Sequence, residues 1–202
     1  MKIVHVETLI SCGPFAESLA WASIRSNLLT AIQAVDWPTG SGSFTIYPES
    51  GKKRKAGNGV TPIKAGLMAR LGKSGWKLEE PIAIAARRQP GKTDAVLYTE
   101  AGPVALEWET GNISSSHRAL NKMTLGLMQG KLAAAVLVVP SRVLYRFLTD
   151  RIGNWDELLP YLELWKSVPC ERGVLEIVVI EHNATSVEVP RIPKGTDGRA
   201  VE

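Results

Sequence analysis

The sequence has few cysteines and no long hydrophobic run, and both absences narrow the class of protein. Its two cysteines, Cys12 and Cys170, are far apart in a chain of 202 residues and match no zinc-binding spacing. No apolar run reaches the roughly 18 residues that a membrane span needs, and the N-terminal residues lack the features of a signal peptide. We therefore expect a reduced, cytoplasmic protein with no membrane partner and with both thiols buried.

Several catalytic motifs are also missing. The sequence contains no Walker A pattern, no zinc cluster and no Gly-x-Ser-x-Gly, which argues against nucleotide hydrolysis, zinc-finger binding and acyl transfer. We expect no nucleotide cofactor. A hydrophobic content of 45% and a charged content of 22% are ordinary for a globular protein of one domain.

Positive charge is concentrated in one part of the chain. Residues 51–92 carry eleven basic and two acidic side chains, whereas the segments on either side are net acidic. A basic block beside a carboxylate cluster is suited to a polyanionic substrate, because the cations can hold phosphates while the acids hold a metal ion. A solvated basic loop is the competing interpretation.

The most informative stretch is the predicted strand Val104–Glu109. Alternate side chains of a strand share a face, so Glu107 and Glu109 point the same way while Val104, Leu106 and Trp108 fill the other face. Two neighbouring carboxylates repel each other and are costly to desolvate. A hard cation such as magnesium, which takes oxygen ligands, would remove that cost. Solvent-facing alternation on an edge strand is the alternative explanation.

A third carboxylate, Asp94, begins the preceding predicted strand. If residues 99–103 form the turn of a hairpin, Asp94 is brought beside Glu107 and Glu109. The sequence therefore predicts that the three carboxylates converge to hold a divalent ion.

Asp94 followed by Glu107-x-Glu109 resembles the PD-(D/E)xK nuclease signature. It resembles in particular the variant found in restriction endonucleases of the BamHI type, in which glutamate replaces the terminal lysine of the signature. The resemblance covers roughly the middle and C-terminal two thirds of the chain. Thr93 departs from the proline of the family pattern, and Glu109 departs from the lysine that many members need.

The resemblance implies an α/β fold with an αβββαβ core, in which helices flank a central mixed β-sheet. It implies a homodimeric type II enzyme that hydrolyses phosphodiester bonds of double-stranded DNA with magnesium, manganese being able to substitute. Asp94 and Glu107 would hold the metal. Glu109 would position the attacking water or act as its general base. A structure-specific repair or recombination nuclease and a DNA-binding module with a decayed site are the alternative functions.

Apolar spacing and turn signals predict the other elements. Helices are expected over 14–35, 61–72, 141–150 and 155–167 and after a cap at Ser114–Ser116. Strands are expected at 3–10, 44–47, 76–87, 95–98, 104–109, 132–139 and 174–180. We expect one nuclease domain, with an N-terminal helix and basic loop (1–60), a catalytic core (61–182) and a C-terminal arm (183–202).

Candidate DNA contacts lie in three places. The basic loop and the start of the helix at Thr61 offer cations and helix N-terminal amides, and the helix after the acidic strand is where the resemblance implies nucleic-acid contacts. The candidates are Lys52, Lys53, Arg54, Lys55, Asn58, Lys64, Asn112, His117, Arg118, Asn121 and Lys122. Ordinary capping and a solvated lysine are the favoured alternative for Asn58 and Lys64, as a surface cap is for His117.

Overall fold

The computed structural model describes residues 1–51, 56–84, 91–149 and 152–194. The strands are β1 (Lys2–Cys12), β2 (Thr45–Ile46), β3 (Lys77–Pro81), β4 (Lys92–Thr99), β5 (Gly102–Trp108), β6 (Ala134–Pro140), β7 (Gly173–Glu181) and β8 (Ala184–Thr185). The helices are α1 (Gly13–Ala16), α2 (Leu19–Gln33), α3 (Thr61–Lys73), α4 (Ile113–Met128), α5 (Arg142–Tyr145), α6 (Trp155–Leu158) and α7 (Leu162–Lys166), with a 3-10 turn η1 (Leu159–Tyr161).

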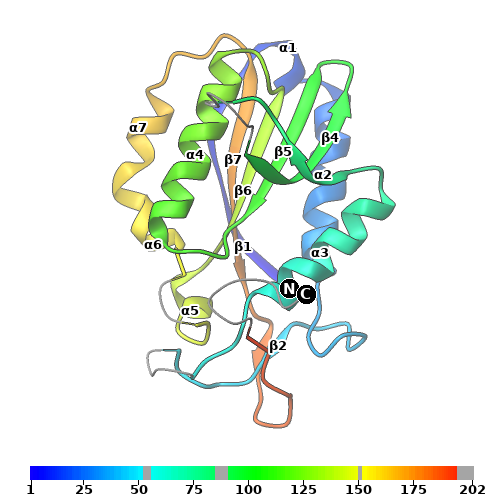
Figure 1. Ribbon diagram of the computed structural model, residues 1–202, viewed down its shortest axis with the longest axis vertical. Helices are drawn as coiled ribbons and strands as arrows, with labels where there is room; N and C mark the ends of the chain where they lie inside the picture. Colours follow the sequence, from blue (N-terminus) through cyan, green and yellow to red (C-terminus); the bar gives the residue numbers. More distant parts are fainter. Residues whose placement is uncertain (52–55, 85–90, 150–151, 195–202) are drawn as a thin grey trace.

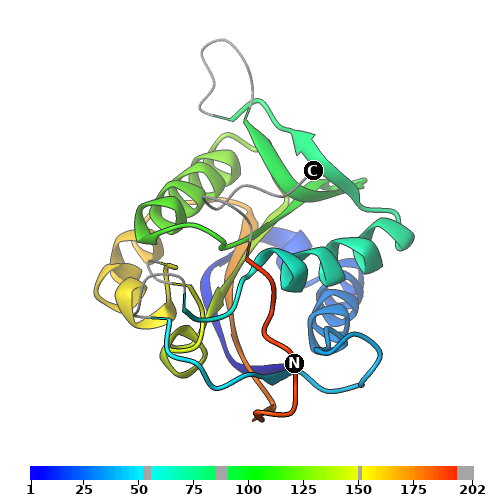
Figure 2. The ribbon, with the colours of Figure 1, turned by 60° about the horizontal axis from the view of Figure 1, so that its bottom comes forward.

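Six of the strands form one mixed sheet in the order β1-β7-β6-β5-β4-β3. Strands β5, β6 and β7 are parallel, whereas β1 pairs antiparallel with β7 and β3–β4–β5 form an antiparallel meander. The predicted hairpin between Asp94 and Glu107 is thus confirmed. Helices cover both faces, as Figures 1 and 2 show, with α2 and α3 on one face and α4, α6 and α7 on the other.

Each face of the sheet has its own hydrophobic core. The apolar side chains of β5 alternate as predicted, because Val104, Leu106 and Trp108 pack under α2 and α3 while Ala105 faces α4. Strand β6 is buried throughout, in agreement with its continuous apolar sequence. Glu107 is in phase with Ala105, so the same alternation directs it to the α4 side of the sheet.

Several predicted boundaries were wrong. The helix expected over 14–35 is interrupted before α2, because the Ser18 side chain accepts a hydrogen bond from the Trp21 N–H and caps a new helix. The helix expected over 155–167 is divided into α6, η1 and α7, with a proline in the first turn of η1. Of the helix expected over 141–150, only α5 forms in the described part of the chain.

The helix expected over 61–72 forms as α3, with Thr61 and Pro62 in its first turn, but one predicted helix cap was displaced. Asn112, rather than the serine run, caps α4, since its side-chain oxygen accepts the Ser114 N–H at 3.0 Å. The strand expected over 76–87 ends at Pro81, and residues 85–90 lie outside the described residues.

Two further expectations can be compared with the structure. Cys12 and Cys170 are free thiols, but both are half-buried rather than buried, because each lies at the margin of the α4-side core. Across the described ranges, every helix is too short or too polar to cross a membrane.

Candidate active site

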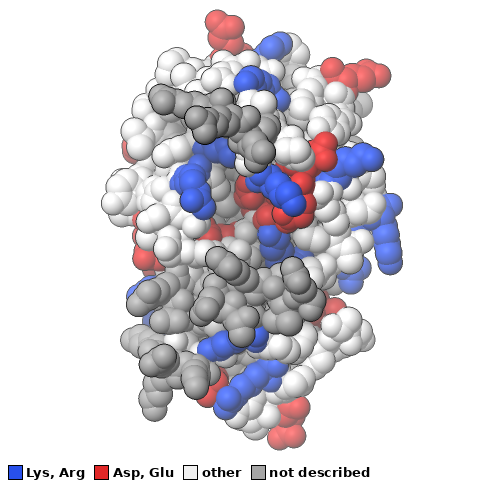
Figure 3. Space-filling view, in the orientation of Figure 1, with Lys and Arg blue, Asp and Glu red and all other residues white. Residues whose placement is uncertain are grey.

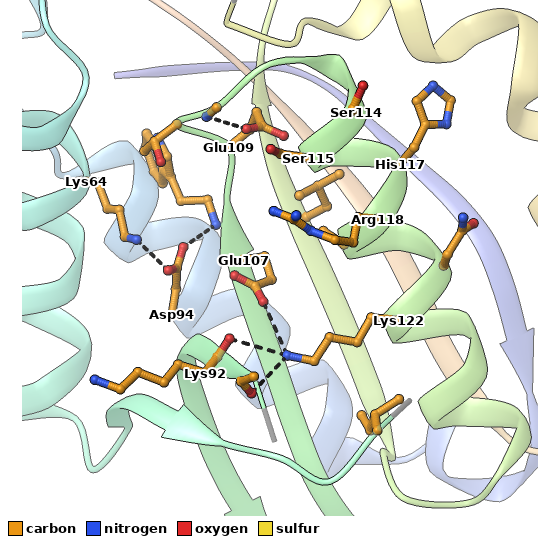
Figure 4. Close-up of a pocket in the computed structure, with 18 of the residues that line it drawn as sticks. Lys64, Lys92, Asp94, Glu107, Glu109, Ser114, Ser115, His117, Arg118 and Lys122 are labelled. Atoms are coloured by element: carbon orange, nitrogen blue, oxygen red, sulfur yellow. Dashed lines mark hydrogen bonds and ion pairs between the residues drawn. The ribbon is translucent and has the colours of Figure 1, made fainter. Parts of the chain in front are cut away.

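Asp94 and Glu107 lie beside each other on the β4–β5 hairpin. Ala95 pairs with Leu106, so Asp94 and Glu107 occupy the next opposed positions of the two strands. The Trp108 N–H donates to Oδ2 of Asp94 at 2.8 Å, and Oδ1 accepts from the ammonium of Lys64 (Figure 4). The hairpin therefore brings together two of the three predicted carboxylates.

The environment of Glu107 disfavours its charged form. Burial raises the pKa of Glu107 to about 7, the negative charge of Asp94 adds to the increase, and the Lys122 ammonium opposes it. Lys122 Nζ lies 3.8 Å from Glu107 Oε1. A carboxyl with a pKa near neutrality, beside a second carboxylate, is typical of a site that binds a cation or transfers a proton.

Two lysines partly neutralise the carboxylates. Lys64 extends from α3 to Asp94, and its Nζ is also 4.0 Å from Glu79 Oε1. Lys122 extends from α4 and donates to Thr93 Oγ1 at 3.0 Å. Its ammonium also donates to the main-chain carbonyls of Gly91 and Lys92, each at 3.3 Å. Both were expected as candidate phosphate contacts, and the structure places both in ion pairs with the predicted metal ligands.

Glu109 has different partners from the other two carboxylates. It follows the last residue of β5, and its N–H still continues the sheet by donating to Val138 O at 2.9 Å. One side-chain oxygen accepts the Gly111 N–H and the other accepts the hydroxyl of Ser116 in α4. Burial raises the pKa of Glu109, although these hydrogen bonds oppose the change.

The three carboxylates do not surround a single point. Among the described residues, no three aspartate, glutamate, histidine or cysteine side chains are grouped closely enough to hold a metal ion. The expectation that Asp94, Glu107 and Glu109 converge was therefore wrong in this respect. Asp94 and Glu107 form the pair, whereas Glu109 is hydrogen-bonded to Ser116 and to the Gly111 N–H.

The pair nevertheless fits a divalent cation. Asp94 and Glu107 offer hard oxygen donors, which magnesium-like ions prefer. Their mutual repulsion is at present offset by the two ammonium groups. The pair lines a cavity of about 940 Å³. Figure 3 shows acidic side chains in a hollow of this face with lysine and arginine side chains around them.

The remaining α4 candidates differ in their availability. Arg118 is exposed, lines the cavity and makes no hydrogen bond or ion pair with the described parts of the chain. Asn121 Oδ1 accepts the Trp165 indole N–H at 3.0 Å, and the His117 ring packs against Tyr161 with centroids 4.7 Å apart. Asn112 is exposed at the helix cap. Among the described residues, the cavity is therefore lined by two cations without an acidic partner, Lys92 and Arg118, and by polar groups that also fix α4.

The expectation of a DNA contact at Asn58 was wrong. Asn58 is fully buried at 0% exposure. Its amide donates to Tyr47 O and Phe147 O at 2.9 Å, and its side-chain oxygen accepts the Ile192 N–H at 3.0 Å. All of these bonds join separate loops, so Asn58 has a structural role. The four predicted contacts Lys52–Lys55 lie outside the described residues.

Sequence reasoning missed Ser116. It was grouped with a serine cap, but its hydroxyl is the buried partner of Glu109. The position of Ser116 in the helix could have indicated this contact. In a helix that begins at Ile113, Ser116 ends the first turn and can face back toward the end of β5.

The fold and this site define a restriction-endonuclease-like nuclease. The structure resembles that of the restriction endonuclease BglII complexed with a DNA 16-mer, with a TM-score of 0.57 at 12% identity over 91% of this chain and 79% of that one. That likeness concerns the fold alone. The sequence then gives the family: residues 1–199 match the model for restriction endonuclease BamHI, and the chain belongs to this family.

Two curated relatives agree with that assignment. The chain is 45% identical over 201 residues to the type II restriction enzyme OkrAI of Oceanobacter kriegii, covering all of both chains. It is 37% identical over 178 residues to the type II restriction enzyme BamHI of Bacillus amyloliquefaciens, covering 84% of this chain and 78% of that one. The chain is thus a type II restriction endonuclease of the BamHI/BglII-like group, an enzyme that hydrolyses DNA at specific sites and, as this class generally does, uses a divalent metal ion.

Proposed function

We propose that this enzyme is a magnesium-dependent endonuclease for double-stranded DNA in which Asp94 and Glu107 hold the ion and Glu109 acts on the attacking water. The observation that carries the proposal is the Asp94–Glu107 pair, whose burial and mutual repulsion raise the pKa of Glu107 to about 7. A divalent ion would hold both groups in their charged forms. Manganese, with the same preference for oxygen ligands, would substitute.

The groups of the site would have separate roles in phosphodiester hydrolysis. Bound magnesium would supply Lewis-acid stabilisation of the charge that develops on the phosphate. Glu109 would orient a water molecule or accept its proton, because its raised pKa brings it closer to the range of a general base. Arg118 lines the same cavity without an acidic partner among the described residues, so it is available to the DNA.

The arrangement also supports a role for α4 in placing the DNA. Arg118 is exposed on the helix that carries Lys122 into the carboxylate site, and Asn112 is exposed at the N-cap of that helix. A DNA contact made by this helix would therefore be rigidly related to the reacting phosphate.

We further propose a homodimer, in which two copies would each cut one strand of a palindromic sequence. Sedimentation of the free enzyme and of its DNA complex tests this directly.

The test is incubation of the enzyme with plasmid DNA and magnesium. Discrete fragments are the expected result, and chelation with EDTA should stop the reaction. A smear of products would favour a structure-directed or nonspecific nuclease, and intact plasmid would favour a DNA-binding protein without activity. Either of these two results would overturn the proposal.

A further inference from the structure

Glu109 is fixed by a partner that lies outside the carboxylate site. Ser116 is fully buried at 0% exposure, and its hydroxyl donates to Oε2 of Glu109. The Gly111 N–H donates to Oε1, so each oxygen of the carboxylate has at least one donor from the chain. A carboxylate has about four acceptor positions. At least one of them remains beside the bonds from Ser116, Gly111 and Thr110, and Glu109 lines the cavity that also contains Asp94 and Glu107.

The backbone around these bonds is closely fitted. A Cβ on Gly111 would lie 2.8 Å from Ser115 Oγ and 3.3 Å from Glu109 Oε1, so these two side chains would have to shift. A Cβ on Gly153 would lie 2.5 Å from Ser116 Oγ. Gly153 is itself held beside this turn, since its N–H donates to Gly111 O at 2.9 Å. The absence of a side chain at Gly111 and at Gly153 thus leaves room for the hydrogen bond between Ser116 and Glu109.

The bond joins two elements with different tasks. Glu109 continues from β5, which carries Glu107, whereas Ser116 belongs to α4, which carries Arg118 and Lys122. Ser116 itself is 0% exposed, so its hydroxyl faces Glu109 and has no contact with solvent. Removal of the hydroxyl would leave the carboxylate with main-chain donors alone, from Gly111 and Thr110, and with more freedom to rotate about its side-chain bonds.

We propose that Ser116 is a positioning residue for the cleavage reaction, holding the Glu109 carboxylate in the orientation in which it acts on the attacking water. This inference rests on the proposed function. It assigns Ser116 no contact with DNA or metal, and its effect on cleavage passes entirely through Glu109. The opposite arrangement, in which Ser116 withholds Glu109 from the reaction, predicts a change of rate in the other direction.

The test compares the Ser116→Ala enzyme with the wild type in cleavage of a short duplex that contains the recognition site. The turnover number should fall by about 10²-fold, as expected when a reacting group loses its orientation. KM and the affinity for the duplex measured in EDTA should stay unchanged. Thr124→Val is the matched control, since Thr124 is a buried α4 hydroxyl that donates only to Leu120 O; it should cleave at the wild-type rate.

A double-mutant cycle shows whether Ser116 acts through Glu109. In a Glu109→Ala background, Ser116→Ala should produce no further loss. An equal loss in both backgrounds would overturn the proposal, as would a Ser116→Ala enzyme that cleaves at or above the wild-type rate. If Ser116→Ala does not fold, Ser116→Cys retains the shape with a weaker donor and should also cleave slowly; a folded cysteine variant with wild-type turnover would overturn the proposal. Wild-type enzyme that fails to cleave would instead refute the proposed function.

Discussion

Asp94 and Glu107 oppose each other one step beyond the paired residues Ala95 and Leu106, and each contacts a lysine from a different helix. Lys64 comes from α3 on one face of the sheet and Lys122 from α4 on the other. The hairpin thus supplies two acidic ligands, and the helices that cover the two faces supply compensating charge. Exchange of that compensation for a divalent ion is the physical basis of the proposed reaction.

Removal of the Glu107 carboxylate should separate binding from cleavage. The Glu107→Ala enzyme should lose at least about 10²-fold in cleavage rate, because one of the two proposed metal ligands would be absent and charge on the phosphate would no longer be stabilised. Its affinity for the duplex in EDTA should remain close to that of the wild type. Single-turnover cleavage and gel-shift titration measure the two quantities.

Glu100 offers a control of the same residue type. It is an exposed glutamate on the β4–β5 turn, at the end of the hairpin remote from Asp94. Glu100→Ala should cleave at the wild-type rate. Unchanged cleavage by Glu107→Ala would show that the metal ligands have been assigned to the wrong residues.

The raised pKa of Glu107 gives the metal-free protein a defined pH dependence. The pKa rises from 4.5 to about 7 on folding, so the folded state binds the proton more tightly than the unfolded state. Stability contributed by the protonated form is present below pH 4.5 and is lost as the pH rises to about 7. The shift corresponds to about 3 kcal/mol in the free energy of unfolding.

A neutral isostere removes this dependence. Glu107→Gln should be more stable than the wild type at pH 8 in EDTA, by up to about 3 kcal/mol, and the difference should vanish toward pH 4.5. Urea unfolding from pH 4.5 to 8 measures it. An equal difference at both ends of this range would contradict a raised pKa at this residue.

Arg118 should contribute to DNA binding without affecting the fold. It is exposed and lacks an acidic partner among the described residues, so its loss leaves no buried group unpaired. Arg118→Ala should weaken duplex affinity by about ten- to a hundredfold, the range of a single good arginine contact. Lys73→Ala, at the exposed C-terminal end of α3, is the control. Equal affinity of both variants in gel-shift titrations would remove Arg118 from the interface.

Asn58 should contribute to the stability of the fold. Asn58→Ala removes two hydrogen bonds to main-chain carbonyls and one from a main-chain N–H in a fully buried position. The free energy of unfolding should fall by about 2–4 kcal/mol. Asn183→Ala should have a smaller effect, because the exposed Asn183 side chain accepts only one hydrogen bond, from the Phe44 N–H. Similar unfolding curves for the two variants would contradict the role assigned to Asn58.

The sequence predicted the central elements well because their signals are local. Alternation in β5, the continuous apolar sequence of β6, the mostly apolar sequence of β7 and the turn between β4 and β5 all follow from neighbouring residues, and all four strands lie where expected. The sequence also placed Asp94 next to Glu107. The resemblance to PD-(D/E)xK nucleases supplied the order of the whole core, which periodicity alone would leave as a mixed sheet covered by helices.

The failures concern contacts between distant segments. The hydrogen bonding of Glu109 depends on Ser116 in the following helix and on the space that Gly153 provides. Asn58 lies in a glycine-rich loop that looks exposed in sequence, yet three other segments close around it. Such burial depends on tertiary packing, which neither spacing nor composition encodes.

Metal binding to the enzyme–DNA complex tests the central claim most directly. Isothermal titration with calcium at pH 8, an ion with the same oxygen preference, should show binding to complexes of the wild type and of Glu100→Ala. Complexes formed by Asp94→Ala and Glu107→Ala should show little or no binding. Calcium binding of equal affinity in all four complexes would contradict a metal site built on Asp94 and Glu107.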